Sequence, residues 1–328
     1  MFDVSAFLAA IDKYENIVIA GHVSPDGDAV GACFAMALFA AARGKKPAVL
    51  LGAYPDSYNC LAGHEFLWQG SWDDVPCELF IALDCGGKDR LGAAVSVFDR
   101  AALTVNIDHH QSNDGFANLN AVDIHKSSAS ELLYTILREI APTGLDMHIA
   151  SALFAGIAFD TGGFRHSSTR PETFEAAATL MRMGTNAAEI QRQILYTHSV
   201  NAAQIFGIAL QHMQISSNAP IAYTMITKEE MEAAGAASHD LDGIVDHVLD
   251  TEGAKAAILL SEREGGVCKI SLRSRELDMN AIAAKFGGGG HRKAAGAAIN
   301  GAPKEALAQV LAECEKEWKT YEIQNKRD

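Results

Sequence analysis

Residues 16–43 read NIVIAGHVSPDGDAVGACFAMALFAAAR, two apolar runs joined by a short polar loop. The first run, residues 16–20, has the length and composition of a buried strand. The second run, residues 28–43, is long enough for an apolar helix, and Gly44 is well placed to end that helix. A strand that passes through a tight loop directly into a helix is the basic unit of an α/β fold.

Strand-like and helix-like segments keep alternating through the first half of the chain. Ser128 and Glu131 match a capping box at the start of a helix that runs to residue 141. Further strands are expected at residues 47–51, 79–83 and 103–107. This rhythm predicts a parallel sheet with helices on both faces.

The pattern after residue 146 is mostly helical. One helix is expected over residues 148–159. The residues from Thr169 to Glu172 resemble a second capping box, and Gly184 would close the helix that follows. Residues 186–213 are expected to form either one long helix or two shorter ones.

A second alternation begins at the strand-like residues 221–226. The runs 256–260 and 267–272 are separated by Glu-Gly-Gly and predict a hairpin. Helices are expected at residues 279–286 and 304–319. We therefore expect an α/β chain made of three parts: a parallel-sheet domain over 1–190, a helical linker over 191–215 and a smaller α/β domain over 216–328.

Composition and charge exclude several classes of protein. The chain has 328 residues, 48% of them hydrophobic, and a net charge of −14. That charge argues against binding of long duplex DNA, which needs many basic contacts, but not against a small nucleotide held by a few Arg and Lys side chains. Six cysteines without a C-x-x-C pair favour reduced thiols and a cytoplasmic location. The apolar residues 29–42 are too few to span a membrane, and no basic signal-peptide start precedes them.

Polar side chains stand where the predicted strands and one helix end. Each has an ordinary alternative role, because Asp and Gly are common in turns and caps, and one of two adjacent histidines is often a core residue. Asp160 fits a cap poorly, since a negative charge at a helix C-terminus opposes the helix dipole. The side chains expected to meet in one crevice are His22, Asp26, Asp28, Asp84, Asp108, His109 and Asp160.

Such a crevice would need cations. The carboxyl ends of parallel strands share one edge of a sheet, so five carboxylates would lie close together and repel each other. Carboxylates outnumber imidazoles in this set and no thiolate is required, which favours Mn²⁺ or a related ion over zinc. A carboxylate that bridges two ions would give the two-metal arrangement used in phosphoryl hydrolysis.

The order of these motifs resembles the DHH phosphoesterase superfamily, which includes RecJ exonucleases, family II pyrophosphatases and cyclic-dinucleotide phosphodiesterases. The likeness rests on H-x-x-x-D-x-D at residues 22–28, the isolated Asp84, D-H-H at residues 108–110 and D-T-G-x-F at residues 160–164. Ser24 departs from the pattern, since Asn is frequent at that position. None of the expected ligands is missing.

The second half resembles the DHH-associated C-terminal domain. Residues 287–296 read GGGGHRKAAG and match its glycine-rich loop, and residues 271–274 read SLRS and match its arginine-bearing strand. The two-domain length resembles the branch that degrades nanoRNA and dephosphorylates 3′-phosphoadenosine 5′-phosphate (pAp). A family II pyrophosphatase would lack the glycine-rich loop, and RecJ enzymes are usually longer.

The resemblance implies a ligand set for two Mn²⁺ ions, with Mg²⁺ or Co²⁺ as substitutes. One ion would be held by His22, Asp26 and Asp84. The other would be held by Asp28, Asp84, His109 and Asp160. Asp84 then bridges the two ions, and water activated between them would attack phosphorus.

The resemblance also implies roles for the remaining motif residues. Asp108 would orient a ligand, and His110 would face the scissile phosphate and assist the leaving oxygen. In the second domain, backbone N–H groups of the glycine run would approach an anion. The substrate-binding residues implied there are Arg273, Gly288, Gly289, Gly290 and His291.

Several functions stay open at this point. The favoured one is hydrolysis of nanoRNA, pAp or the dinucleotide pApA, and the alternatives are hydrolysis of cyclic di-AMP or of pyrophosphate. A nucleotide-binding regulatory module with a decayed site is a rival from another class, although the acid and histidine set is complete. The expected partners are short RNA or small nucleotides, without duplex DNA or a membrane, and a homodimer is left open.

Overall fold

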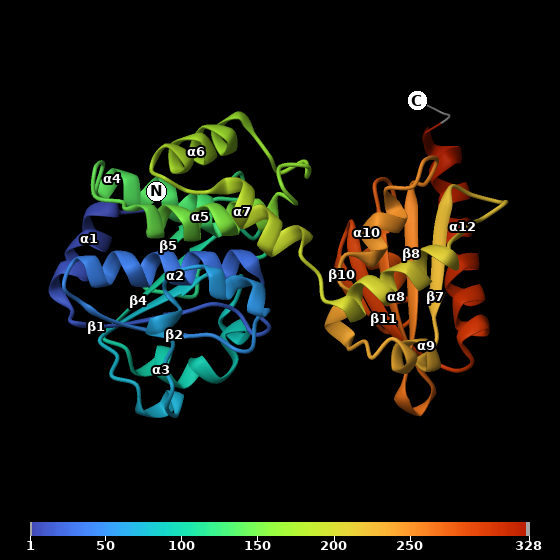
Figure 1. Cartoon of the computed structure of the whole chain (residues 1–328), viewed down its shortest axis with the longest axis horizontal. Coiled ribbons are helices and arrows are strands. Elements are labelled where there is room, and N and C mark those ends of the chain that lie inside the picture. Colours follow the sequence, from blue (N-terminus) through green and yellow to red (C-terminus); the bar gives the residue numbers. More distant parts are fainter. Residues whose placement is uncertain (1, 326–328) are drawn as a thin grey trace. The chain divides into compact units, whose positions relative to one another are not determined.

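The computed structural model describes residues 2–325 and divides into two compact units, residues 1–197 and 198–328 (Figure 1). The division between Thr197 and His198 falls inside the segment 191–215 that the sequence predicts as a linker. No helix within the described residues is both long and apolar enough to cross a membrane.

The first unit contains a five-stranded parallel sheet in the order β2-β1-β3-β4-β5. Its strands are β1 (Asn16–Ala20), β2 (Lys46–Leu50), β3 (Leu79–Leu83), β4 (Leu103–Asp108) and β5 (Leu119–Val122). The strand pattern read from the sequence is confirmed for the first four. The edge strand β5 was not predicted, because its four residues, LNAV, carry no continuous apolar run.

Helices cover both faces of this sheet, as the alternation predicts (Figure 1). Side chains of Ile17, Ile19 and Ile81 face the helices α1, α2, α4 and α5. Val18 and Phe80 point to the opposite face, where α3 packs. The helices are α1 (Val4–Lys13), α2 (Gly27–Ala42), α3 (Val95–Arg100), α4 (Ala129–Ile140), α5 (Met147–Asp160), α6 (Pro171–Arg182) and α7 (Ala187–Gln191).

The pairing of α2 with α5 depends on a glycine. A Cβ added at Gly31 would lie 2.5 Å from the carbonyl oxygen of Ala152 and 2.8 Å from the backbone nitrogen of Gly156. Only glycine allows the two helices to approach this closely. The contact fixes the start of α2 against α5, and both elements carry site residues.

The two capping boxes predicted from the sequence are not formed as expected. Ser128 Oγ does accept from the backbone N–H of Glu131 at 3.0 Å, but the Glu131 carboxylate binds Ser127 and Thr173 instead of returning to Ser128. The second helix begins one residue later than predicted, and the Thr173 hydroxyl accepts from the backbone N–H of Arg170. The Thr169 hydroxyl, expected to cap this helix, is buried without a hydrogen-bond partner among the described residues.

The segment 186–213 forms two helices, not one. A single π-helical turn, residues 192–196, follows α7, and α8 (Val200–Gln211) lies in the second unit. α8 packs against the second sheet.

The second unit contains a six-stranded sheet in the order β10-β11-β9-β8-β7-β6. Its pairs are antiparallel except for β7 with β8. The predicted hairpin is confirmed as β8 and β9. The strands are β6 (Gln214–Ile215), β7 (Ile221–Ile226), β8 (Ala256–Arg263), β9 (Val267–Ser274), β10 (Gly289–His291) and β11 (Ala294–Asn300).

Helices cover both faces of the second sheet too. α8 and α10 pack with one apolar cluster, while α11 and α12 pack with another on the opposite face. The helices besides α8 are α9 (Lys228–Ala233), α10 (Ile244–Leu249), α11 (Met279–Ala284) and α12 (Pro303–Asn325). Short 3₁₀ turns occur at Asp56–Cys60, His64–Phe66, Trp72–Asp74, Lys88–Ala94, Ser238–Leu241 and Glu264–Gly266.

Candidate metal centre

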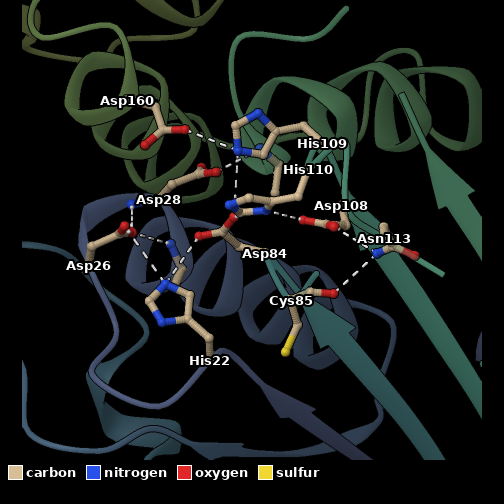
Figure 2. Close-up of polar contacts among 12 residues, drawn as sticks. His22, Asp26, Asp28, Asp84, Cys85, Asp108, His109, His110, Asn113 and Asp160 are labelled. Carbon is tan, nitrogen blue, oxygen red and sulfur yellow. Dashed lines mark hydrogen bonds and ion pairs between the residues drawn. The ribbon is translucent and has the colours of Figure 1, made fainter. Parts of the chain in front are cut away.

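Side chains from three strand ends and two helices meet at the carboxyl edge of the first sheet (Figure 2). They arrive there because β1, β3 and β4 are parallel neighbours and therefore end at the same edge. α2 and α5 add one end each. The structure brings together all eight predicted side chains: His22, Asp26, Asp28, Asp84, Asp108, His109, His110 and Asp160.

One group of ligand atoms contains His22, Asp26 and Asp84. The Nδ1 atom of His22 lies 2.8 Å from the carbonyl oxygen of Val23, so this nitrogen carries a hydrogen and Nε2 is the ring atom left to bind a metal ion. His22 Nε2 lies 3.7 Å from Asp26 Oδ2 and 3.5 Å from Asp84 Oδ2. These separations suit atoms that share one ion better than atoms in direct hydrogen bonds, since ligands at about 2.1 Å from a metal lie about 3–4 Å apart.

The carboxylate of Asp26 is oriented by the helix that it caps. Its Oδ1 accepts from the backbone N–H groups of Asp28 and Ala29, at 3.0 and 3.2 Å, which leaves Oδ2 toward His22. Burial would raise the pKa of Asp26, but His22 and the two N–H groups outweigh it and lower that pKa. Burial likewise opposes protonation of His22, yet the carboxylates of Asp26 and Asp84 raise its pKa to about 10.

A second group contains Asp28, His109 and Asp160. His109 Nε2 lies 3.2 Å from Asp160 Oδ2 and 3.6 Å from Asp84 Oδ1. Burial opposes protonation of His109, but Asp160 and the other carboxylates raise its pKa to about 10. Burial raises the pKa of Asp160 to about 6, although His109 acts in the opposite direction.

Asp28 is fully buried and is held by the N-terminus of α4. Its two carboxylate oxygens accept from the backbone N–H groups of Ala129 and Ser130, at 2.6 and 2.9 Å. Burial, together with the charge of Asp84, raises the pKa of Asp28 to about 7. Each oxygen has a second lone pair, so the contact to α4 is compatible with a metal ligand.

Asp84 occupies the centre of the cluster in a strained conformation. Its φ angle is +54°, a region that residues other than glycine rarely adopt, and such strain is concentrated at functional sites. The residue is 2% exposed, and its Oδ1 atom has no hydrogen-bond partner among the described residues. A buried carboxylate oxygen without a donor is costly unless a cation binds it. The donor set therefore fits one or more divalent ions.

Crowding of the carboxylates explains the proton affinities of this cluster. Burial raises the pKa of Asp84, and the nearby charges of Asp26 and Asp160 raise it further against the opposing effect of His22. Without cations, the cluster lowers its charge by holding protons. A divalent ion would relieve the same repulsion.

Asp108 and His110 form a pair that is supported by two asparagines. His110 Nδ1 lies 2.7 Å from Asp108 Oδ1. Asn113 Nδ2 donates to Asp108 Oδ2 at 2.6 Å and to the carbonyl oxygen of Cys85 at 3.2 Å (Figure 2). It also donates to Asn106 Oδ1 at 2.7 Å, and Asn106 Nδ2 donates to the same carbonyl oxygen at 3.2 Å. This network links the end of β3 to the D-H-H loop.

Sequence reasoning did not single out either asparagine. A signal was present, since Asn106 interrupts an apolar strand and Asn113 follows the histidines within four residues. Because Nδ1 of His110 is taken by Asp108, its Nε2 is the atom left for a substrate, although His110 Nδ1 also lies 3.6 Å from Asp84. Burial of the Cys85 thiol raises its pKa to about 12, which makes it a poor ligand.

The predicted substrate-binding residues lie in the second unit. Arg273, on β9, donates from Nε to Asp246 Oδ1 at 2.9 Å. Gly289 and Gly290 of the glycine run lie in the strand β10. The N–H of Gly288 donates to the carbonyl oxygen of Ala283, and that of Gly290 donates to Asn280 Oδ1. The N–H groups of Gly288 and Gly290 therefore already have acceptors within the fold, and the His291 side chain is exposed.

Both halves of the chain match models of known protein families. A family model described as the DHH family, N-terminal domain, matches residues 16–157, and one described as the DHHA1 domain matches residues 218–320. The bifunctional oligoribonuclease and PAP phosphatase NrnA of Thermus thermophilus is 30% identical over 303 residues, which cover 92% of this chain and 89% of that protein.

Solved structures agree with this assignment. An exopolyphosphatase-related protein from Bacteroides fragilis superposes with a TM-score of 0.90 at 26% identity, over 97% of this chain and 96% of that one. RecJ from Thermus thermophilus, solved in complex with Mn²⁺, shares the fold at a TM-score of 0.54 and 15% identity. That match covers 95% of this chain and 53% of RecJ.

Proposed function

The chain belongs to the DHH family of phosphoesterases, and on this basis we propose that it is a manganese-dependent hydrolase of short nucleotides, namely nanoRNA, pAp and pApA. Hydrolysis of phosphoesters is the chemistry of the family. The choice of short nucleotides is supported by the similarity to an oligoribonuclease and PAP phosphatase along nearly the whole chain. The net charge of −14 agrees with a small substrate.

The proposal assigns two ions to the cluster at the sheet edge. His22, Asp26 and Asp84 would hold one ion. Asp28, Asp84, His109 and Asp160 would hold the other. The observation that carries this assignment is the buried carboxylate of Asp84. Its Oδ2 lies 3.5 Å from His22 Nε2, and its Oδ1, which has no hydrogen-bond partner among the described residues, lies 3.6 Å from His109 Nε2. Divalent ions bound there would supply Lewis-acid activation of water and neutralise charge on the phosphoryl group.

The side chains around the ions have separate tasks in this proposal. The Asp26 and Asp28 carboxylates are fixed by helix N–H groups, so the ligands are preorganised and do not reorient on binding. His110 is held by Asp108, and this hydrogen bond raises the pKa of its imidazole. The protonated ring can then donate from Nε2 to the oxygen that leaves phosphorus.

The second unit is proposed to bind the substrate through Arg273 and His291. Arginine presents a planar set of donors that matches a phosphate group. One face of Arg273 is occupied by Asp246, which orients the guanidinium. Replacing Arg273 by Ala should therefore raise KM more than it lowers kcat, because the residue contacts substrate and not the reacting atoms.

A substrate panel tests the proposed function. The purified full chain with Mn²⁺ is offered pAp, pApA, a five-nucleotide RNA, cyclic di-AMP and pyrophosphate, and product is followed by chromatography. We expect turnover of at least one linear nucleotide and its loss with chelator. Asp84→Ala should abolish turnover and lower the number of bound Mn²⁺ ions measured by calorimetry.

The panel also separates the alternatives. Turnover of cyclic di-AMP alone or of pyrophosphate alone would replace the proposed substrate class. Nucleotide binding without turnover, in protein that binds Mn²⁺ with normal stoichiometry, would favour a regulatory module.

A further inference from the structure

A buried tyrosine of the first unit lies beside the loop that carries Asp26 and Asp28. Tyr58 belongs to the 3₁₀ turn Asp56–Cys60, and only 2% of the residue is exposed. The hydroxyl group of a buried tyrosine usually has a hydrogen-bond partner, because it is costly to remove from water without one. The surroundings of this hydroxyl group therefore indicate what it binds.

Glycine at position 27 makes room for the hydroxyl group. A Cβ atom added at Gly27 would lie 2.2 Å from Tyr58 Oη and 2.5 Å from Cγ of Phe159. The backbone at Gly27 is not left-handed, so lack of space, and not backbone conformation, excludes larger residues there. The glycine between the two aspartates thus lets Tyr58 Oη reach the backbone that joins them.

The segment around Tyr58 is held close to α2 on both sides. Before the turn, the ring of Tyr54 makes an edge contact with the ring of Phe34 on α2, and the ring centroids are 5.9 Å apart. After the turn, a Cβ atom added at Gly63 would lie 2.5 Å from Cβ of Phe34. The turn between these two contacts is therefore fixed against α2, and Tyr58 needs no rearrangement to act at the start of this helix.

Carboxylates from both groups of ligand atoms act on the Tyr58 hydroxyl group. Burial raises the pKa of Tyr58. The charges of Asp26, Asp160 and Asp28 raise that pKa further, so the group stays protonated at neutral pH and can donate its hydrogen. Asp26 belongs to one group of ligand atoms, and the other two aspartates belong to the second group. An acceptor that bridges the two proposed ions would therefore lie near this donor.

The ligand carboxylates are engaged by other partners. Asp26 Oδ1 accepts from two backbone N–H groups of α2, and both carboxylate oxygens of Asp28 accept from α4. Asp160 Oδ2 lies 3.2 Å from His109 Nε2. The proposed ions would engage further lone pairs of the same carboxylates. A phosphoryl oxygen bound at the ions is then the acceptor best suited to the Tyr58 hydroxyl group.

We infer that Tyr58 is a further catalytic residue, whose hydroxyl group donates a hydrogen bond to a non-bridging oxygen of the phosphoryl group that is hydrolysed. This inference rests on the proposed function and adds a donor that lies outside the motifs read from the sequence. A donor held in place at this oxygen would stabilise the negative charge that the phosphoryl group carries in the transition state.

Phosphate binding tests the donor without catalysis. The full chain loaded with Mn²⁺ is titrated with inorganic phosphate by calorimetry. Tyr58→Phe keeps the ring and should weaken phosphate binding by about tenfold, the effect of losing one hydrogen bond to a charged group. The number and affinity of the bound Mn²⁺ ions should stay unchanged. A weakened Mn²⁺ affinity would place the hydroxyl group on a ligand carboxylate and overturn the inference.

A second buried tyrosine provides the control. Tyr134 lies in the same apolar core and is 4% exposed, and its hydroxyl group accepts from Arg138. Tyr134→Phe should bind phosphate and turn over nucleotide as the unchanged protein does. This comparison separates the loss of the Tyr58 donor from the general effect of removing a hydroxyl group from the core.

Kinetics test whether the donor acts in the reaction. Tyr58→Phe should lower kcat for the nucleotide substrate by about 100-fold, the usual effect of removing one donor to a developing negative charge. Unchanged phosphate affinity and unchanged kcat in Tyr58→Phe would overturn the inference, even if the variant unfolds at a lower temperature. If the unchanged protein hydrolyses no nucleotide, the proposed function fails, and the phosphate titration still decides the role of Tyr58.

Discussion

The carboxamide nitrogen of Asn113 lies 2.6 Å from Oδ2 of Asp108, and the same Asp108 carboxylate binds His110 through its other oxygen. Asn113 thus acts on His110 through an intermediate side chain and is a positioning residue. It also reaches the backbone that follows Asp84, through the carbonyl oxygen of Cys85.

We expect Asn113→Ala to lower kcat by about 10- to 100-fold, the usual effect of losing a residue that supports the side chains around a metal site. KM should change little, because substrate contacts are kept. Asn113→Asp should be worse, since it places a like charge beside Asp108. Steady-state kinetics on pAp measure both, with the exposed Asn325→Ala as the control. A matching fall in thermal stability without a change in kcat would show a purely structural role.

The strained backbone at Asp84 predicts that removing this side chain lowers activity but raises the stability of the metal-free protein. Asp84→Gly should remove activity, yet it should stabilise the metal-free protein by about 1–3 kcal/mol, because glycine adopts a φ of +54° without penalty. Asp84→Asn removes the charge and keeps the strain, so it separates the two effects. Urea unfolding in chelator measures both. Equal stability of the two variants would mean that the backbone stores no strain here.

Glu131 predicts a pH-dependent contribution to stability. Burial would raise the pKa of this carboxyl group, but hydrogen bonds from Ser127 and Thr173 outweigh burial and lower it below the ordinary value of 4.5. The stabilisation is therefore fully present above pH 4.5 and is lost as the pH falls through the lower pKa of the folded state. Glu131→Gln should cost about 1–3 kcal/mol at pH 7.

That cost of Glu131→Gln should shrink below pH 4.5. Urea unfolding at several pH values measures it, and Glu139→Gln on the exposed side of α4 serves as the control. A difference that stays constant to pH 3 would contradict the assignment.

The contact at Gly31 predicts a steric limit between α2 and α5. Gly31→Ala should destabilise the protein by about 1–3 kcal/mol, because the added Cβ meets the carbonyl oxygen of Ala152. Gly207→Ala, in the helix α8, meets no atom within 4 Å and should instead stabilise by about 0.5–1 kcal/mol. Thermal unfolding of the two variants measures whether their changes in stability have opposite signs. A neutral Gly31→Ala would show that the helices can shift apart.

Local patterns in the sequence predict most of the fold. The apolar run 79–83 matches β3 to the residue, because a buried central strand must be apolar throughout. The short edge strand β5 escapes prediction, since its pairing with β4 and not its composition defines it. Parallel pairing also explains why strand-end residues such as Asp84 and His109, distant in sequence, could be predicted to meet.

The sequence does not reveal contacts that depend on tertiary partners. Glu131 binds Thr173, 42 positions away, and not the predicted cap. Gly289 and Gly290 pair with β11 as part of β10, where a glycine-rich loop was expected. The side-chain direction of Asn113 is set by three acceptors from other segments. Spacing alone does not encode these choices.

The contact between Asp28 and the start of α4 has a practical consequence for trapping a substrate complex. The carboxylate joins residues about a hundred positions apart in the chain. An Asn side chain at position 28 would turn an amide donor toward one of these backbone donors. A variant at position 28 would therefore lose a metal ligand and weaken the contact to α4 at the same time, and the two effects could not be separated. An inactive variant for substrate complexes is better made at His110, whose imidazole makes no contact with a helix N-terminus.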